Sequence, residues 1–385
     1  MKIGILTFIH TRNFGANLQC FALQHQLSLM GYDSEVINLY RPDDKGYLPC
    51  EDDKKRFPKL YSYHSLKDYR KRINKFIASV IRRLKTDKSS FDSDGFTSFR
   101  NEFIHFSSEE YRNFTQLYNG FPQSKYTHLI VGSDQVWNYA SGFSKEPFFL
   151  TFADKVKKIA YAPSLGHTNI PSPVKEIYKN WLSDFNSISV REESASIIFS
   201  DLLNQNIPFV LDPTLLLNRE QWVKAFNISD DTKESIILVY MLSVSTDVMN
   251  FANDLAKKLG CKVKIITSRP VLGNHENCEI LRNENPKSFI ELFNRAKFVV
   301  TNSFHGTAFA INFNIPFVTI DKINNRLVTR KLSLLKLLCV EHRHLYEGEK
   351  IVVDDYIKCD FSETNRILQQ ERVKSFKFLT ESLNS

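Results

Sequence analysis

The sequence has few cysteines and no long apolar run. Its 385 residues contain six cysteines, and none forms a Cys-x-x-Cys pair or joins a histidine in a zinc-like cluster. Scattered thiols are typical of a reducing compartment, so we expect a cytoplasmic protein. No stretch reaches the roughly 18 apolar residues of a membrane-spanning helix. The apolar start is interrupted by His10 and Arg12, and no small-residue cleavage site follows it, so we expect no signal peptide.

Motifs that hold nucleotides, metals or a nucleophilic serine are also missing. The Walker loop Gly-x-x-x-x-Gly-Lys-Ser/Thr does not occur, and Gly-x-Gly-x-x-Gly does not follow the first predicted strand. The elbow Gly-x-Ser-x-Gly is missing too, and no His-x-x-x-His pair indicates a catalytic metal. We therefore expect a protein that works without a metal or an organic cofactor.

Positive charge is in excess. The chain has 51 lysines and arginines against 43 aspartates and glutamates, a net charge of +8. Such a balance suits an anionic substrate, an anionic membrane surface or a nucleic acid. No helix of recognition type stands beside a basic face, so we expect no nucleic-acid partner. The hydrophobic content of 42% is that of a globular protein, and the length allows two domains.

Strand and helix patterns alternate along the chain, which predicts an α/β fold with parallel sheets. We expect two Rossmann-like domains, at residues 1–214 and 215–361, and a terminal helix at 362–385. The predicted strands are residues 3–8, 34–39, 127–134, 158–164, 186–193, 208–214, 235–242, 263–267, 298–301 and 316–321. A polar loop is predicted at residues 10–17, and helices are predicted at residues 18–30, 247–259, 286–297, after His305, at 327–338 and at 362–383.

Residues 43–94 form an insertion rich in lysine, arginine, aspartate and serine. Within it, residues 66–84 place apolar side chains at helical spacing and basic side chains at most other positions. Two interpretations stay open. The segment is either a surface helix packed on its own domain or a helix that contacts anionic lipid.

The most informative stretch is residues 298–310, where a short apolar strand passes into a helix. Asn302 and Ser303 are both helix-capping residue types. His305 falls in the first turn, where free backbone N–H groups favour an anion, and Gly306 permits close approach to the backbone. This pattern predicts a phosphate or carboxylate site with an imidazole in reach. The alternative is a buried histidine satisfied by a backbone carbonyl.

Functional groups in parallel sheets collect where strands end. Apart from the histidine segment, three such groups occur in the sequence. They are Asn13, Gly15, Asn17 and Gln19; Gly132, Ser133, Asp134, Gln135 and Asn138; and Arg191, Glu192 and Glu193. Asp321 and Arg326 follow the next strand after His305. The Gly-Ser-Asp sequence also suits a plain turn and cap, and the arginine also suits a surface ion pair.

Five segments together resemble the polysaccharide pyruvyl transferases, in order and in spacing. They are residues 3–7 with 13–19, 131–138, 189–194, 211–214 (Leu-Asp-Pro-Thr) and 302–306 (Asn-Ser-Phe-His-Gly). The resemblance implies an architecture similar to that of GT-B glycosyltransferases. It also implies phosphoenolpyruvate as donor and, as acceptor, a sugar of a cell-surface polysaccharide or its lipid-linked precursor. The product would be a pyruvate ketal, formed without a cofactor.

The resemblance also implies roles for single residues. The C-terminal domain would be the donor side, and the donor would contact Arg191, His305, Gly306 and Arg326. From the strand-end positions we assign the N-terminal domain as the acceptor side, with Asn13, Asn17, Gln19, Asp134, Gln135 and Asn138. His305 is our candidate general acid, and Asp134 is our candidate general base. One position departs from the resemblance, because Ser303 stands where some members carry an arginine.

Two other functions stay open at this point. One is a glycosyltransferase of the same two-domain shape that uses a nucleotide sugar. The other is a non-catalytic subunit of an exopolysaccharide assembly. The basic segment at residues 66–84 leaves open whether the protein also binds the inner face of the membrane.

Overall fold

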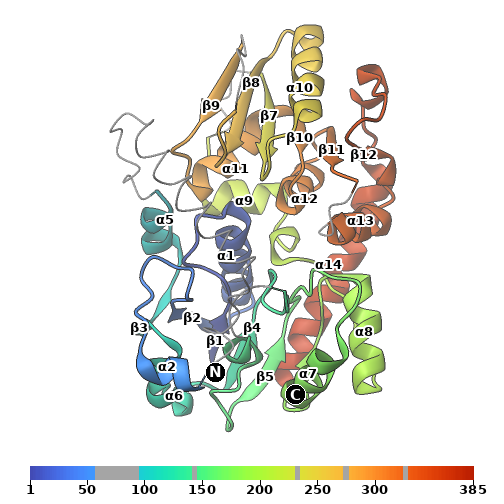
Figure 1. Ribbon diagram of the computed structural model, residues 1–385. Coiled ribbons are helices and arrows are strands. Elements are labelled where there is room, and N and C mark those ends of the chain that lie inside the picture. The colour runs from blue at the N-terminus through green and yellow to red at the C-terminus, as the bar shows by residue number, and fades with distance from the viewer. Residues whose placement is uncertain (57–94, 141–144, 230–234, 272–276, 324–327) are drawn as a thin grey trace.

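The computed structural model describes residues 1–56, 95–140, 145–229, 235–271, 277–323 and 328–385 (Figure 1). The predicted basic helix at residues 66–84 lies outside these ranges, and so does Arg326. The lipid-contact interpretation therefore stays a prediction. In the described parts of the chain, no helix combines the length and the apolar character that crossing a membrane requires.

Two six-stranded sheets form the framework, and every strand pair between the named strands is parallel. The first sheet has the order β3-β2-β1-β4-β5-β6 and the second has the order β12-β11-β10-β7-β8-β9. Numbered from its own first strand, each sheet reads 3-2-1-4-5-6, which is the Rossmann order. The prediction of an α/β protein with two Rossmann-like domains in a GT-B-like architecture is therefore confirmed.

The strands are short and mostly buried, as expected for parallel sheets covered by helices. The N-terminal sheet contains β1 (Lys2–Leu6), β2 (Asp33–Leu39), β3 (Phe106–Tyr111), β4 (His128–Val131), β5 (Lys157–Ala160) and β6 (Ser187–Ile188). The C-terminal sheet contains β7 (Ile236–Met241), β8 (Lys262–Thr267), β9 (Cys278–Leu281), β10 (Ala296–Thr301), β11 (Phe317–Asp321) and β12 (His344–Tyr346). The predicted domain limits stay a prediction.

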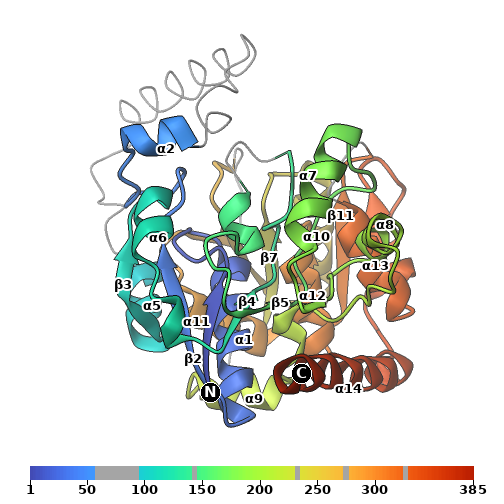
Figure 2. The ribbon, with the colours of Figure 1, turned by 90° about the horizontal axis from the view of Figure 1, so that it is seen from below.

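The helices connect the strands and cover the sheets (Figures 1 and 2). In chain order they are α1 (Phe14–Leu29), α2 (Glu51–Arg56), α5 (Gly95–Phe103), α6 (Phe114–Gly120), α7 (Ser172–Leu182), α8 (Glu193–Leu203), α9 (Arg219–Ala225), α10 (Thr246–Leu259), α11 (Pro286–Arg295), α12 (Phe304–Asn312), α13 (Val328–Leu337) and α14 (Ser362–Asn384). Short 3-10 turns lie between them, among them η3 (Pro213–Leu215). The last helix, α14, runs back beside the N-terminal sheet (Figures 1 and 2), where Phe378 packs near Tyr161.

Several local predictions are wrong. The strand predicted at 186–193 is limited to β6 (Ser187–Ile188), and Glu193 already begins α8. The loop predicted at residues 10–17 ends early, because the side chain of Asn13 accepts from the Ala16 N–H and α1 begins at Phe14. The strand predicted at 208–214 is reduced to one bridge between Val190 and Phe209, since prolines 208 and 213 have no N–H to donate. The helix predicted at 286–297 ends at Arg295, and the next two residues begin β10.

One apolar cluster joins the two halves of the molecule. It contains residues of α1 together with residues of α9, α11, α12 and α14. Phe14 at the start of α1 stacks on Phe289 of α11, with ring centroids 4.7 Å apart, and meets Tyr240 of β7 edge-on. This packing holds the N-terminus of α1 against the C-terminal half.

Candidate functional site between the two sheets

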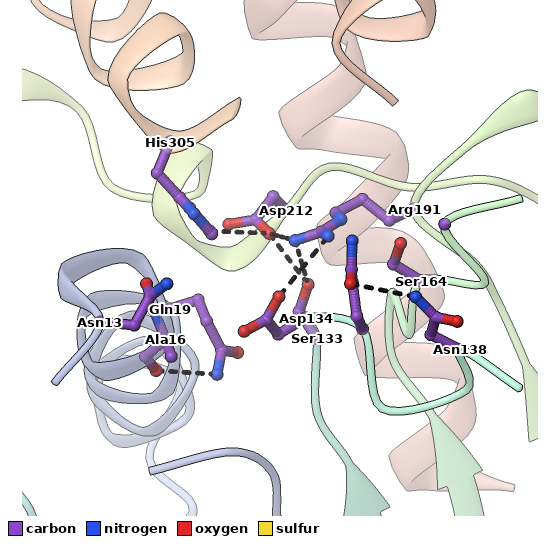
Figure 3. A network of polar contacts seen from close by, with 12 residues as sticks. Asn13, Ala16, Gln19, Ser133, Asp134, Asn138, Ser164, Arg191, Asp212 and His305 are labelled. Carbon is purple, nitrogen blue, oxygen red and sulfur yellow. Dashed lines mark hydrogen bonds and ion pairs between the residues drawn. The ribbon is translucent and has the colours of Figure 1, made fainter. Parts of the chain in front are cut away.

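The site lies where strand order reverses in both sheets. In a sheet of this order, ligands bind beside the C-terminal ends of the two strands at the reversal. In the N-terminal sheet these strands are β1 and β4, which lead into α1 and into residues 132–134. In the C-terminal sheet they are β7 and β10, and β10 leads into α12. Figure 3 shows side chains from both halves meeting here. His305 extends from the C-terminal half at the top of the view, and Asn13 lies on the N-terminal half below it.

Asp212, the N-cap of η3, is the buried anion at the centre (Figure 3). Its Oδ2 accepts from Nη1 of Arg191 at 2.6 Å and from the Ser133 hydroxyl at 2.9 Å. Its Oδ1 accepts from the backbone N–H and the hydroxyl of Thr214. Burial would raise the pKa of this carboxyl, but His305 and Arg191 beside it hold the pKa well below its usual range. Asp212 is therefore ionised.

Arg191 follows β6 and is buried. Its Nη1 is bound to Asp212, and Nη2 lies 3.8 Å from Oδ1 of Asp134. Nε and Nη2 have no hydrogen-bond partner in the described chain. The guanidinium carbon lies 4.6 Å from the ring centroid of Phe304. The alternative of a surface ion pair with neighbouring glutamates is wrong, because this arginine is buried and paired with Asp212.

His305 lies in the first turn of α12, as predicted. Ser303 is the N-cap, and its hydroxyl accepts from the Gly306 N–H. Nε2 of His305 points toward Asp212, at 3.8 Å from Oδ2, and has no hydrogen-bond partner in the described chain. The imidazole packs on Gly15 of α1, where a Cβ would lie 1.9 Å from Nδ1. A carboxylate, rather than a backbone carbonyl, thus faces the free nitrogen.

Asn302, the other residue predicted as a helix cap, does not cap α12. The side chain of Asn302 accepts from the Leu242 N–H at 2.8 Å and donates to the Ser243 carbonyl at 2.7 Å. It therefore joins the ends of β10 and β7. Gly306 is buried, and a Cβ there would lie 2.4 Å from Oγ1 of Thr301. This glycine allows α12 to begin close against its own strand.

The three predicted acceptor residues of α1 are largely engaged in local structure. Asn13 caps the helix, and Nδ2 of Asn17 donates to the carbonyls of Thr11 and Asn13. Nε2 of Gln19 donates to Thr7 and to the Ala16 carbonyl. Oδ1 of Asn17 and Oε1 of Gln19 are buried without a hydrogen-bond partner in the described chain. These two oxygens of α1 could accept hydrogen bonds from a ligand hydroxyl.

The residues after β4 reach the same place. Asp134 is partly buried and has a positive φ of 69°, a conformation that aspartate tolerates better than most side chains. Its carbonyl accepts from the Ser164 N–H at 2.7 Å, and its carboxylate faces Arg191. Asn138 accepts from the Ala140 N–H and lies 3.1 Å from Nε2 of His167. The structure thus brings Asp134, Arg191 and His305 together around Asp212.

Gln135 makes the contact that crosses to the C-terminal half. A guanidinium only donates, so the oxygen of the Gln135 amide faces Arg330 of α13 and accepts from its Nη1 at 2.9 Å and Nη2 at 2.6 Å. Burial, and then the nearby charge of Arg191, lower the pKa of Arg330 to about 10. The sequence analysis did not select Arg330, because one arginine on an amphipathic helix has no local signal that separates it from a surface residue.

Glu192 and Asp321, two other acidic residues that the sequence analysis named, make contacts that stabilise the fold. Oε1 of Glu192 accepts from the N–H groups of Leu165 and Gly166 and from the Ser164 hydroxyl. Asp321, at the end of β11, is paired with Lys331 and His344 of its own half. In the described chain no group of three or more histidine, cysteine, aspartate or glutamate residues is arranged to hold a metal ion.

Comparison with solved structures finds proteins that span nearly the whole chain at low sequence identity. The Staphylococcus aureus MnaA–UDP structure has 13% identity, covers 96% of this chain and 90% of its own, and gives a TM-score of 0.48. Escherichia coli heptosyltransferase WaaC with ADP has 12% identity, 96% and 100% coverage, and a TM-score of 0.39. The Methanocaldococcus jannaschii UDP-GlcNAc 2-epimerase complex with UDP-GlcNAc and UDP has 11% identity, 96% and 99% coverage, and a TM-score of 0.49.

The comparison with protein families is more specific. No curated protein matches the chain. The family model described as polysaccharide pyruvyl transferase matches residues 13–322, which is well over half of the sequence and contains every residue of the site described above except Arg330. The chain therefore belongs to the polysaccharide pyruvyl transferase family.

Proposed function

We propose that this protein transfers the pyruvyl group of phosphoenolpyruvate to two hydroxyls of one sugar, forming a pyruvate ketal. The acceptor is a cell-surface polysaccharide or its lipid-linked precursor. The observation that carries the proposal is the group formed by Arg191, His305 and Asp134 around the ionised Asp212, in a chain of this family. A cation can bind the anionic groups of this enol phosphate, an imidazole can donate a proton and a carboxylate can accept one.

Donor binding is assigned to Arg191 and the start of α12. Nε and Nη2 of Arg191 are two adjacent donors in the plane of one guanidinium, which suits two oxygens of a carboxylate or phosphate. The N-terminus of α12 adds a partial positive charge beside them. Asp212 fixes the guanidinium by its third nitrogen, so the other two are held in one orientation.

The reaction requires one proton at the methylene carbon and two new C–O bonds at C2. In our proposal His305, whose Nε2 faces Asp212 at 3.8 Å, delivers the proton to the methylene carbon. One sugar hydroxyl then attacks C2 while Asp134 accepts its proton. The second hydroxyl displaces phosphate from C2 and its proton leaves with the phosphate. Asp134 then returns its proton to His305 through solvent, which restores both groups. Over the full cycle one acceptor proton therefore replaces the proton placed on the new methyl group, and the other ends on phosphate.

The test is to incubate the purified protein with phosphoenolpyruvate and a panel of glycan acceptors. Phosphate release is measured together with the mass of the acceptor. We expect equal amounts of phosphate and of acceptor carrying one ketal-linked pyruvate. We also expect phosphoenolpyruvate to raise the melting temperature and nucleotide sugars to leave it unchanged. A nucleotide sugar that is consumed would point to a glycosyltransferase, and binding without turnover of any donor would point to a non-catalytic subunit.

A further inference from the structure

Arg330 belongs to the C-terminal half and points at the N-terminal half. It lies in the first turn of α13, and its guanidinium reaches the Gln135 amide oxygen across the boundary between the halves. No carboxylate oxygen of the described chain lies within 4.0 Å of it, whereas Arg191 has Asp212 at 2.6 Å. Within the described chain, the hydrogen-bond partner of Arg330 at the site is therefore a neutral amide, and the carboxylates of Glu192, Asp134 and Asp212 act on its charge from farther away.

Two arginines share one aromatic ring at this point. The guanidinium carbon of Arg191 lies 4.6 Å from the Phe304 ring centroid, and that of Arg330 lies 5.9 Å from the same centroid. Like charges brought together in a partly dehydrated place repel each other, and each disfavours the charged form of the other. An anion that contacts both guanidinium groups would remove this cost. Phe304 immediately precedes His305, so that anion would also lie beside the candidate acid.

The helix that carries Arg330 is fixed on both sides. The next residue, Lys331, is buried and pairs with Asp321 at 2.5 Å, and its amine also donates to Thr319. Three residues after Arg330, the hydroxyl of Ser333 accepts from the backbone N–H of Glu193 at the start of α8. One contact joins α13 to its own sheet and the other joins it to the N-terminal half. Arg330 is thus a positioned side chain rather than a mobile surface arginine.

We propose that Arg330 is a further donor-binding residue, which binds the carboxylate or phosphate of the donor together with Arg191. This inference rests on the proposed function for the identity of the donor, but the anion site itself follows from the geometry. Gln135 orients the guanidinium through its amide oxygen. The donor is then held between an arginine of each half, with His305 beside it.

The experiment compares four folded variants, namely Arg330→Gln, Arg330→Lys, Gln135→Ala and Lys336→Gln, with the wild type. Arg330→Gln removes the charge, and Gln135→Ala removes the neutral partner. Lys336→Gln is the matched control, because Lys336 lies on the same helix and is exposed, and among the residues that the structure describes its amine approaches only Glu193, at 3.7 Å. Binding of phosphoenolpyruvate and of inorganic phosphate is measured by calorimetry, and circular dichroism and melting temperature establish that each variant is folded.

We expect Arg330→Gln to weaken phosphoenolpyruvate binding by about 10- to 100-fold, as expected for loss of a charge-assisted contact. The KM for the acceptor should not change. Lys336→Gln should bind within twofold of the wild type, and Gln135→Ala should lose less affinity than Arg330→Gln. Arg330→Lys keeps the positive charge but lacks the paired N–H donors of a guanidinium, so it should bind phosphoenolpyruvate more tightly than Arg330→Gln and less tightly than the wild type.

Two outcomes would overturn the inference. One is a folded Arg330→Gln variant that binds phosphoenolpyruvate as tightly as the wild type. The other is a loss of phosphoenolpyruvate affinity in Gln135→Ala as large as that in Arg330→Gln. That result would mean that the Arg330–Gln135 pair only connects the two halves. If the wild type binds phosphate but not phosphoenolpyruvate, and Arg330→Gln weakens phosphate binding, the proposed function fails and the anion site stands. If the wild type binds neither anion, both fail.

Discussion

A single buried carboxylate, Asp212, orders the charged groups of the site. It accepts four hydrogen bonds and lies 3.8 Å from His305, so it neutralises Arg191 and sets the direction of its free N–H groups. Within the low-dielectric interior such a pair is costly to break, because the remaining charge has lost its solvation and its partner. The site is therefore preorganised by a residue that we do not assign to the chemistry.

We expect Asp212→Asn to lower the free energy of unfolding by about 3–5 kcal/mol at pH 7, because it leaves Arg191 buried and charged without a counter-ion. Ser133→Ala is the control. It removes one hydrogen bond to the same carboxylate and should cost about 1.5–3 kcal/mol. Urea unfolding of the two variants measures both effects. A loss in Asp212→Asn no larger than in Ser133→Ala would show that the charge of the pair contributes nothing.

The same variant carries a pH prediction. The pKa of Asp212 is lower in the folded chain than in the unfolded chain, so its stabilisation is fully present above the unfolded pKa of about 3.9 and is lost as pH falls toward the folded value. The difference in stability between wild type and Asp212→Asn should therefore be constant from pH 7 to about pH 5. It should shrink as the pH is lowered further. A difference that grows on acidification would contradict this assignment.

Asp134 allows a separate kinetic prediction. It lies 3.8 Å from Arg191 but does not share the hydrogen bonds of Asp212, so its carboxylate is available to a ligand hydroxyl. We expect Asp134→Asn to lower turnover by about 100-fold or more while the affinity for phosphoenolpyruvate changes little, because a base acts in the transition state. Steady-state kinetics at varied phosphoenolpyruvate concentration separates the change in turnover from the change in donor affinity. Unchanged turnover with weakened donor binding would make Asp134 a ligand and place the base elsewhere.

Two helix N-termini, one from each half, meet at the site. Asn13 caps α1 and Ser303 caps α12, and the His305 ring of α12 packs against Gly15 of α1. Only a residue without a Cβ permits this contact, since a Cβ at position 15 would overlap the imidazole. The glycine thus fixes how closely the first turns of the two helices approach.

We expect Gly15→Ala to displace the His305 imidazole and to lower transfer activity by at least about 10-fold, because a misplacement near 1 Å is costly in an oriented site. The matched control is Gly120→Ala at the end of α6, where a Cβ has nothing within 4 Å and should leave activity unchanged. Activity and melting temperature are measured for both variants. Equal activity in the two would mean that the ring position is not set by α1.

Elements with a strong apolar period were predictable, and short edge elements were not. The buried strands β1, β7 and β10 and the helix α14 follow from apolar runs and helical spacing. The strands β3, β9 and β12 were missed, because each is short and exposes part of its surface, so its apolar pattern is weak. Helices α5 to α9 were missed for a related reason, being mostly short with few buried positions.

The same contrast applies to the site. Arg191, Asp134 and His305 follow strands, so their placement at the edge of a sheet follows from local pattern. Asp212 occurs in a Leu-Asp-Pro-Thr sequence that looked like the end of a strand, and Arg330 lies on a helix 118 positions further along the chain. What brings these two residues to the others is the packing of one half against the other, which no local period encodes.

At the scale of the whole molecule, each half of the described chain has an apolar cluster of its own, and a third cluster extends across both halves. The cluster that contains Ile3 and Ile5 of β1 also contains Trp222 of α9, Phe309 of α12 and Leu379 of α14. Besides its apolar contacts, α14 is connected to the segment between the sheets, because Arg372 donates to the Leu215 carbonyl. Interfaces between domains are commonly small and polar, and a large apolar one couples the domains mechanically.

We therefore expect the two halves to unfold together, in one transition that far-ultraviolet circular dichroism and tryptophan fluorescence report at the same denaturant concentration. Leu379→Ala should test the coupling, because this side chain is fully buried in the shared cluster. It should lower the free energy of unfolding by about 2–5 kcal/mol and keep the transition single. Val373→Ala on the same helix is the control, since Val373 is 58% exposed and its loss should cost about 0.5 kcal/mol or less.

Tryptophan positions make this test informative about each half. Trp137 and Trp181 belong to the N-terminal half, whereas Trp222 lies in the shared cluster. Fluorescence of a variant that keeps Trp222 alone reports the shared cluster, and fluorescence of one that keeps Trp137 alone reports the N-terminal half. If the halves are coupled as the packing indicates, Leu379→Ala shifts both signals by the same amount. A shift confined to Trp222, or two resolved transitions in the wild type, would mean that the N-terminal sheet folds independently and that the site forms only when the halves dock.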